Sequence, residues 1–307
     1  MNSPTFSVII PVYNAAASLR RAVESVRAQS FTDWECIIIN DGSSDQSLVN
    51  AFALAAMDAR IKVKSHDNQG VSFTRNVGWH LANGKYVAFL DADDTWQSEK
   101  LATHLAFHRQ FENADISFAQ ISFMNEENSL GPFSYSSVPN HILRIEDVIG
   151  EHPICTMSNV VARTSLIDKI GGFANNLSHA EDQEWLARAI SKGCVIQGID
   201  HHLVDYYDSP NGLSSDLMAM YDGWQSFAET YVTEAQFKKQ DALYCRYLAR
   251  RALRGGSGAW QACQFAFRGA RADQRTFFAN PYRGGMTILC AGAALFIPQF
   301  LHRKIFA

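Results

Sequence analysis

Apolar residues in the first part of the chain fall into short runs that alternate with helical patterns. The runs are rich in the branched and aromatic residues that strands favour, and they cover residues 6–10, 34–39, 61–64 and 86–90. Apolar positions at helical spacing separate them, at residues 15–29, 45–57 and 71–82. A helix at 98–111 and a strand at 116–123 continue the series. The alternation predicts an α/β fold, Rossmann-like, with a mostly parallel central sheet flanked by helices.

The regular alternation weakens after residue 124. Residues 125–140 are rich in Asn, Ser, Gly and Pro and predict a loop. Order returns with a strand-like stretch at 157–162, a short helix at 164–170, a helix at 181–191 and strands near 195 and at 203–207. From residue 215 the pattern is helical and increasingly basic. We therefore predict two domains, 1–215 and 216–307.

The composition is that of a folded protein with an uneven charge distribution. The 307 residues are 47% hydrophobic and 12% aromatic, which excludes a disordered or collagen-like chain. The formal net charge of −4 conceals +9 over residues 244–307 and −13 over the rest. An acidic body with a basic C-terminal part indicates two different tasks.

Three features bear on the cellular compartment. The six cysteines are scattered, without a C-x-x-C pair or zinc-type spacing, and predict reduced core residues of a cytoplasmic protein. The first apolar run is too short for a signal peptide. Residues 286–297 carry no charge but fall short of the roughly 20 residues that a spanning helix requires. That segment is either a core helix or an interfacial one.

The candidate chemistry begins directly after the apolar run at 86–90, where Asp91, Asp93 and Asp94 follow one another closely. Ligand sites in parallel sheets lie at the carboxyl ends of strands, where grouped acids repel one another unless a cation joins them. Mg²⁺ and Mn²⁺ commonly combine one or two carboxylates with substrate phosphates, so a nucleoside diphosphate is the first ligand to consider. The alternative is an Asp-rich turn that caps the next helix.

Other polar residues follow the neighbouring strands. Tyr13 and Asn14 come after Pro11, where we expect the chain to leave the sheet, although this alone would be an ordinary strand end. Asp41 ends the second strand, and its carboxylate can accept hydrogen bonds from a nucleobase or a ribose. Arg75 opens the third helix, and its guanidinium can reach a base edge or a phosphate. All of these positions are expected at one edge of the sheet.

Residues 8–14, 40–45, 68–78 and 89–94, in this order and spacing, resemble the nucleotide-binding half of family 2 inverting glycosyltransferases, which have the GT-A fold. The resemblance is dense over about the first 110 residues. It implies that Asp41 binds the base, usually uracil, with Tyr13 lining the base pocket and Arg75 assisting. It further implies that Asp91 touches the ribose and that Asp93 ligates Mn²⁺ or Mg²⁺. The full set of predicted donor-binding residues is Pro11, Tyr13, Asn14, Asp41, Arg75, Asn76, Asp91 and Ala92.

A second constellation starts at residues 171–173, Gly-Gly-Phe, and continues at Glu181 and Asp182. Acidic side chains stabilise the N-terminus of a helix, so the alternative to a catalytic role for Glu181 and Asp182 is a structural one. By the resemblance, Asp182 is the catalytic base, and Glu181 is the fallback. Inverting displacement at a sugar carbon needs such a base for the acceptor hydroxyl and a cation for the departing diphosphate.

The chain departs from the family pattern at residues 203–211, where relatives often place an Arg or His near the diphosphate and this chain offers acids and Tyr. Either His201 or His202 substitutes, or the loop at 209–215 closes differently over the donor. A surface role for His202 is the simpler alternative.

The basic part contains Arg246, Arg250 and Arg254 at i+4 spacing, on one helix face. A solvated face is the plain interpretation. A net charge of +9 next to an apolar segment also suits an enzyme at the inner face of the cytoplasmic membrane, acting on a lipid-linked or growing glycan. Nucleic-acid binding is a poor fit, because the acidic body would repel phosphate.

The sequence thus predicts an inverting hexosyl- or N-acetylhexosaminyltransferase of bacterial glycan biosynthesis that uses a nucleotide sugar, UDP-linked by preference. A nucleotidyltransferase would carry a Gly-rich, Lys-bearing loop after the first strand, and residues 14–17, Asn-Ala-Ala-Ala, are not one. The other alternative is a non-catalytic sugar-nucleotide or membrane adaptor that kept the fold. The acids at 91, 93 and 182 argue against it.

Overall fold

The computed structural model describes residues 3–124, 131–132, 134–207, 212–255, 258–298, 301–302 and 305. Its contacts divide the chain into two compact units. The first combines residues up to 143 with 153–207, and the second combines 144–152 with the residues from 208 onward. The sequence placed a single boundary near 215, so it did not anticipate that 144–152 would pack with the later helices. Parts of the predicted loops at 125–140 and 209–215 lie outside the described residues.

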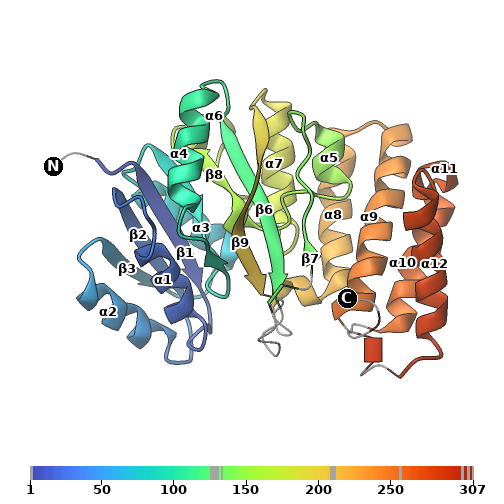
Figure 1. Ribbon diagram of the computed structural model, residues 1–307, viewed down its shortest axis with the longest axis horizontal. Helices are drawn as coiled ribbons and strands as arrows, with labels where there is room; N and C mark the ends of the chain where they lie inside the picture. The colour runs from blue at the N-terminus through green and yellow to red at the C-terminus, as the bar shows by residue number, and fades with distance from the viewer. Residues whose placement is uncertain are drawn as a thin grey trace. The chain divides into compact units, whose positions relative to one another are not determined.

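Within the described residues, the first unit contains a nine-stranded sheet in the order β3-β2-β1-β4-β8-β6-β9-β5, with β7 paired to β6 (Figure 1). The strands are β1 Phe6–Val12, β2 Trp34–Asp41, β3 Ile61–His66, β4 Tyr86–Phe89, β5 Thr95–Trp96, β6 Ile116–Met124, β7 Ser134–Tyr135, β8 Val161–Arg163 and β9 Ile196–Tyr207.

Six of these described strands run in one direction. β1, β2, β3 and β4 are mutually parallel, and β6 and β9 are parallel to each other. β8 is antiparallel to both β4 and β6, so the two parallel groups point the same way. This confirms the predicted mostly parallel central sheet, which places the ends of β1, β2 and β4 at one edge.

Helices cover both faces of this sheet. The helices of the first unit are α1 Leu19–Arg27, α2 Ser47–Met57, α3 Val71–Leu81, α4 Lys100–Gln110, α6 Leu166–Ile170 and α7 Glu181–Ser191. Because side chains alternate along a strand, Val8 and Ile10 pack with Leu19 of α1 on one face. On the other face, a Cβ at Gly78 of α3 would overlap Ile9, so the helix lies directly on the sheet.

The first strand continues through Pro11, contrary to the expectation that the chain leaves the sheet there. Pro11 is in register with Ile39 of β2. The pairing of β1 with β4 ends at Ile9 and Phe89, where Ile9 accepts a hydrogen bond from Leu90. The amide missing in Pro11 faces that same side, beyond the end of β4, so the proline removes no ladder hydrogen bond.

Two further predictions about the second half of the first unit were wrong. Residues 157–159 form a 3₁₀ turn, η1 Met157–Asn159, and only Val161–Arg163 is a strand. The two short strands expected near 195 and at 203–207 are one strand, β9, whose pairing with β6 shifts register around Ala119 and Gln120. The irregularity explains the broken hydrophobic pattern, because a bulge reverses which side chains face the core.

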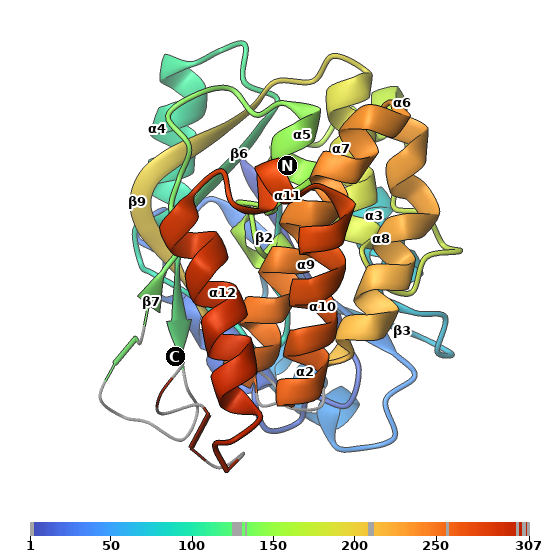
Figure 2. The same ribbon diagram turned by 90° about the vertical axis from the view of Figure 1, so that its right-hand side faces the viewer.

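The second unit is helical in its described residues. It contains α5 Ile145–Ile149, η2 Leu213–Ser215, α8 Leu217–Tyr231, α9 Glu234–Gly255, α10 Ala259–Ala272, α11 Gln274–Phe277 and α12 Pro281–Ala294 (Figure 2). Trp224 of α8 stacks on Tyr244 of α9 and donates its indole N–H to the carbonyl of Ile149 at 2.8 Å. That bond secures α5 to the later helices. None of the helices in the described part of the chain is both long and apolar enough to cross a bilayer.

Arg246 does not lie on a solvated face, although the i+4 spacing made that the plain interpretation. Its guanidinium is buried, 2.7 Å from Glu151 and 2.8 Å from the carbonyl of Phe277. It therefore joins the segment after α5 to the end of α11. Arg250 and Arg254 are partly buried on the same helix.

Candidate active site

The turn after β4 fixes the first acid of the Asp-rich motif through three partners. Asp91 accepts hydrogen bonds from Arg75 Nη2 at 2.8 Å on one carboxylate oxygen and from Thr156 Oγ1 at 3.2 Å on the other. Its own backbone N–H donates to Ser158 Oγ at 2.9 Å. The Asp91 side chain is about a quarter exposed. Its carboxylate is thus held in one orientation while one side stays open to a ligand.

Asp94, whose role the sequence left open, anchors the motif. It is buried, and its carboxylate accepts a 2.5 Å hydrogen bond from Ser158 Oγ and one of 3.1 Å from the backbone N–H of Tyr207. Burial, followed by the negative charges of Asp93 and Asp91, raises the pKa of Asp94 well above its ordinary value. The bonds tie the turn after β4 to the end of β9.

Sequence reasoning missed Thr156 and Ser158, because it assigned their neighbourhood to a strand. Thr156 caps η1 by accepting from the Ser158 N–H at 3.1 Å, and the Ser158 carbonyl accepts from the Trp96 indole at 2.9 Å. The turn therefore presents both hydroxyls to the acids at 91 and 94. Two hydroxyl residues in an otherwise apolar stretch were the available signal.

Arg75 joins two parts of the site that are far apart in sequence. It is buried, with Nη1 2.6 Å from Glu181 Oε1 and Nη2 2.8 Å from Asp91 Oδ1, and it lies 5.6 Å from the ring of Phe173. Burial lowers the pKa of Arg75, but the two carboxylates outweigh it and raise the pKa, so the side chain stays charged. Both terminal nitrogens are engaged, and the predicted contact with a nucleobase stays a prediction.

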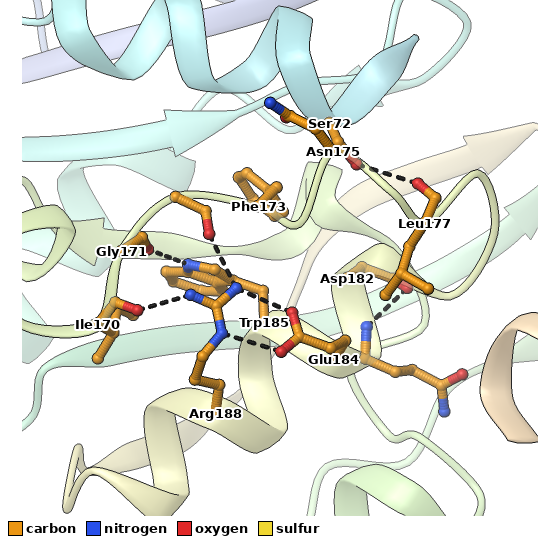
Figure 3. A network of polar contacts seen from close by, with 12 residues as sticks. Ser72, Ile170, Gly171, Phe173, Asn175, Leu177, Asp182, Glu184, Trp185 and Arg188 are labelled. Carbon is orange, nitrogen blue, oxygen red and sulfur yellow. Dashed lines mark hydrogen bonds and ion pairs between the residues drawn. The ribbon is translucent and has the colours of Figure 1, made fainter. Parts of the chain in front are cut away.

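The acid pair begins α7 directly after Ala180, whose φ of 59° is rare for a residue with a side chain. Burial, opposed by the charge of Arg75 and reinforced by that of Asp182, raises the pKa of Glu181 to about 7. Glu181 is buried against Arg75, whereas Asp182 is partly exposed and accepts from the backbone N–H of Gln183 at 2.7 Å (Figure 3). The two neighbouring acids therefore occupy different environments.

The Gly-Gly turn at 171–172 is fixed to α7 by side chains of that helix. Arg188 donates to the carbonyls of Ile170 at 2.6 Å and Gly172 at 2.8 Å, and it is paired with Glu184 at 2.8 Å (Figure 3). Trp185 donates its indole N–H to the carbonyl of Gly171 at 3.1 Å. These hydrogen bonds join the Gly-Gly turn to the body of the helix that begins at the acid pair.

Asn76, predicted to bind the donor, holds the loop that leads to the acid pair. Its side-chain oxygen accepts from the Phe173 N–H at 2.7 Å, and its amide donates to the Phe173 carbonyl at 2.9 Å and to Asn175 at 3.1 Å. Ser72 on the same helix donates to the carbonyl of Leu177 at 3.3 Å. Asn76 positions this loop, and its contact with a donor stays a prediction.

The predicted residues of the base pocket lie at the carboxyl ends of β1 and β2 and in the loops that follow them. Asp41 is buried and accepts backbone N–H bonds from Gln69 at 2.8 Å and Gly70 at 3.0 Å, which fixes the entry to α3. Asn14 adopts a left-handed φ of 49° and accepts from the Ser44 N–H at 2.8 Å. Tyr13 is 56% exposed, so its ring is available to a ligand. Pro11 and Ala92 are buried and can offer only backbone atoms.

Arg21 provides a positive charge beside the acidic turn, and the sequence did not single it out. Its Nη2 donates to the backbone carbonyl of Asp93 at 2.8 Å, and its guanidinium lies 3.7 Å from the centre of the Tyr207 ring. The Arg-free stretch at 203–211 was the departure noted in the sequence, and a cation from α1 reaches the same neighbourhood. Helical spacing alone gave no signal for this contact.

His202 is engaged by a carboxylate of its own strand. Its Nε2 lies 2.8 Å from Asp205, which also accepts from Ser122 at 2.6 Å and Gln97 at 2.7 Å. His201 is exposed on the same strand. These contacts favour the structural alternative for His202.

The carboxylates of the acidic turn can hold a metal ion only if a bound ligand supplies the remaining oxygen atoms of its coordination sphere. Among the residues that the structure describes, no three His, Cys, Asp or Glu side chains come together as a metal cage. Asp91 and Asp94 are engaged by Arg75 and by hydroxyl donors, as described above, and burial, followed by the charges at 93 and 91, raises the pKa of Asp94. This excess of negative charge fits a hard cation held through one carboxylate and ligand phosphates.

Comparison with known sequences assigns most of the first unit. The model of the family described as "Glycosyl transferase family 2" matches residues 7–171. The putative teichuronic acid biosynthesis glycosyltransferase TuaG of Bacillus subtilis is 30% identical over 240 residues, 77% of this chain and 89% of that protein. The putative glycosyltransferase EpsH of the same organism is 43% identical over 94 residues, 31% of this chain. That match spans only 27% of EpsH.

Among solved structures, S. aureus TarS 1–349 in complex with UDP-GlcNAc has a similar fold. The two superpose with a TM-score of 0.61 at 18% identity, over 95% of this chain and 91% of TarS 1–349. The likeness confirms the predicted fold class.

Proposed function

This chain belongs to glycosyl transferase family 2, and from that membership we propose that it transfers a sugar from a nucleoside diphosphate donor to an acceptor hydroxyl with inversion. The observation that carries the proposal is the contact of Arg75 with both Asp91 and Glu181. The buried guanidinium of Arg75 joins the sheet edge where we expect the donor to bind with the helix that begins at the acid pair. Binding and proton transfer are thus served from one rigid centre.

The donor is a UDP-sugar. TarS, whose fold this chain shares, is described in complex with UDP-GlcNAc. The exposed ring of Tyr13 and the carboxylate of Asp41 line the ends of β1 and β2, and Asp91 follows β4. An aromatic face and fixed carboxylates suit a base and a ribose. The sugar itself, hexosyl or N-acetylhexosaminyl, is decided by parts of the pocket that these residues do not specify.

The acidic turn fits a divalent cation, Mn²⁺ or Mg²⁺, held by Asp93 together with the diphosphate. When bound, such an ion neutralises the charge that develops on the departing diphosphate. Arg21 lies next to Asp93 and adds a second positive charge there. Asp94 and Ser158 keep the turn in place, and Asp91 is fixed toward the ribose by Arg75.

Asp182 is the base that removes the proton of the acceptor hydroxyl. Glu181 is buried and 2.6 Å from Arg75, an arrangement that orients it and leaves it poorly placed to meet an acceptor. Asp182 is more exposed on the same first turn of α7. Glu181 therefore acts as a positioning residue, and it is the fallback base.

The acceptor is a glycan or a lipid-linked precursor in bacterial glycan biosynthesis, and the enzyme works at the inner face of the cytoplasmic membrane. One similar relative is described as acting in teichuronic acid biosynthesis, and the residues from 244 onward carry a net charge of +9. The rival functions, a non-catalytic adaptor and a nucleotidyltransferase, explain neither the acid pair nor its link to Arg75.

Calorimetry of UDP binding with and without Mn²⁺ tests the donor site without relying on activity. We expect Mn²⁺ to strengthen UDP binding at least tenfold, and we expect Asp93→Ala to abolish that gain. The matched control is Asp67→Ala, an exposed acid of the same unit. UDP binding that responds to neither the metal nor Asp93→Ala would refute the proposed metal site, and no UDP binding at all would refute the donor.

A further inference from the structure

Helix α12 of the second unit has its large apolar side chains on the outside. Its buried positions are small, Gly284, Thr287, Ala291 and Ala294, and they pack against α9 and α10. A Cβ at Gly284 would lie 2.6 Å from the carbonyl of Phe277, which shows how close the packing is. The large apolar side chains exposed on α12 and the following turn are Tyr282, Met286, Ile288, Leu289, Leu295 and Phe296.

This distribution is the reverse of that in a helix covering a globular core. Tyr282 is 76% exposed, Leu289 is 65% exposed and Phe296 is 89% exposed. Residues 284–298 contain no charged side chain. An apolar surface this continuous marks an interaction site.

Arginines border the beginning of this surface. Arg283 lies on the first turn of α12, and Glu151 is shared between Arg283 at 3.3 Å and Arg246 at 2.7 Å. The pKa of Arg250 is lowered by burial and then by the charges of Arg254, Arg283 and Arg246, with Glu151 opposing. In the described residues, the single carboxylate of Glu151 thus lies near a cluster of four arginines, Arg246, Arg250, Arg254 and Arg283, and the cluster retains positive charge.

We propose that the exposed face of α12, formed by Tyr282, Met286, Leu289 and Phe296, inserts into the interface of an anionic lipid bilayer, with the exposed Arg283 of the arginine cluster at the lipid phosphates. The helix then lies in the membrane plane and does not cross the bilayer. The inference deepens the proposed function, because an acceptor carried on a lipid is reached at that surface. It also answers the question that the sequence left open for residues 286–297.

The chemistry of the surface favours a bilayer over a protein occupant. A tyrosine at the border between arginines and an aliphatic face has the amphipathic character that membrane interfaces select. A second copy packed through the same face of α12 would bring two arginine clusters together without placing an opposing charge between them. An anionic lipid layer provides both an apolar phase and negative phosphates.

Vesicle flotation with the full chain tests the inference. We expect the protein to float with vesicles that contain phosphatidylglycerol, to float far less with phosphatidylcholine alone, and to be released by salt. The double variant Leu289→Glu/Phe296→Glu should lower the bound fraction at least tenfold. The matched control is Phe52→Glu on α2, which is 57% exposed and should leave vesicle binding unchanged.

Two further readouts separate this inference from the proposed function. The melting temperature and UDP binding of the double variant should equal those of the wild type, because the changes lie on an exposed face. Equal flotation of the double variant and the wild type would overturn the inference, as would a wild type that binds no vesicles. If the wild type is a dimer that binds no vesicles, and the double variant is a monomer, the exposed face of α12 binds a second copy of the chain instead of a bilayer. If the wild type floats with vesicles but does not bind UDP, the proposed donor is refuted and the inference about the membrane surface is retained.

Discussion

Arg75 Nη1 lies 2.6 Å from Glu181 Oε1, although 106 positions separate the two residues in the chain. The same guanidinium holds Asp91 at 2.8 Å, so one side chain on α3 fixes both the acid after β4 and the acid before the proposed base. Because all three charges are largely buried, the geometry of the site depends on this centre.

Replacing Arg75 should destabilise the fold as well as the site. Arg75→Met leaves Glu181 buried without its partner, and we expect the free energy of unfolding to fall by about 3 kcal/mol. Urea denaturation measures the loss. Lys238→Met, which removes an exposed pair with Glu234, is the control and should change stability by less than about 0.5 kcal/mol. Equal effects of the two substitutions would show that the Arg75 centre carries no special stability.

Neutralising the proposed base should separate binding from transfer. For Asp182→Asn we expect UDP-sugar binding to be retained and the transfer rate to fall at least ~100-fold, the low end of general-base effects. Glu181→Gln is the matched control, since the amide oxygen can still accept from Arg75. It should retain far more activity than Asp182→Asn. The reverse order of the two variants would move the base to Glu181.

Ser158 should act on donor binding through the acids that it holds. Ser158→Ala removes a hydroxyl from Asp94 and from the Asp91 N–H, and we expect a loss of about 1–3 kcal/mol in stability. UDP affinity should fall with it, because the turn that carries Asp93 is no longer anchored. Ser226→Ala, which loses an exposed bond to a carbonyl in α8, should change neither quantity. If Ser158→Ala binds UDP with the wild-type affinity in calorimetry, Ser158 does not position the turn for donor binding.

Lys100 should make stability depend on pH in the alkaline range. Its side chain is fully buried, with Nζ 3.2 Å from both His104 and the Asn159 carbonyl, and burial lowers the pKa of Lys100 to about 7. At pH values between about 7 and the ordinary lysine pKa, Lys100 is protonated in the unfolded chain and neutral in the folded chain. The contribution of Lys100 to stability should therefore rise with pH over this interval, by on the order of 3–5 kcal/mol in total.

The variant Lys100→Met isolates that contribution. It should be more stable than the wild type at pH 7 and lose most of the alkaline rise, whereas Lys85→Met, at an exposed position, should follow the wild type. Thermal melts of the three proteins from pH 7 to pH 10 measure the difference. A parallel pH dependence of Lys100→Met and the wild type would show that Lys100 titrates normally.

The sequence was most informative where periodicity and strand ends coincide. The βαβ alternation predicted the sheet, and strand-end logic placed Asp41 and Asp91 at one edge, because both rules depend only on local spacing. The contact between Arg75 and Glu181 could not be predicted, since it depends on how two helices on one face of the sheet approach each other. Thr156 and Ser158 were missed because a 3₁₀ turn and a strand have similar polar patterns over three residues.

The second unit shows a different limit. Spacing alone made Arg246 a surface residue, but burial against Glu151 and the Phe277 carbonyl is a tertiary feature. Composition identified residues 286–297 as uncharged without revealing which side would be buried. Only the packing of small residues inward shows that the large ones face outward.

A crystal structure of the full chain with UDP and Mn²⁺ would decide whether the acidic turn binds the donor through a metal ion. We expect density for the ion between Asp93 and the diphosphate, with uracil near Tyr13 and Asp41 and with Asp182 facing the position of the transferred sugar. A nucleotide bound elsewhere, with no ion at Asp93, would contradict this expectation.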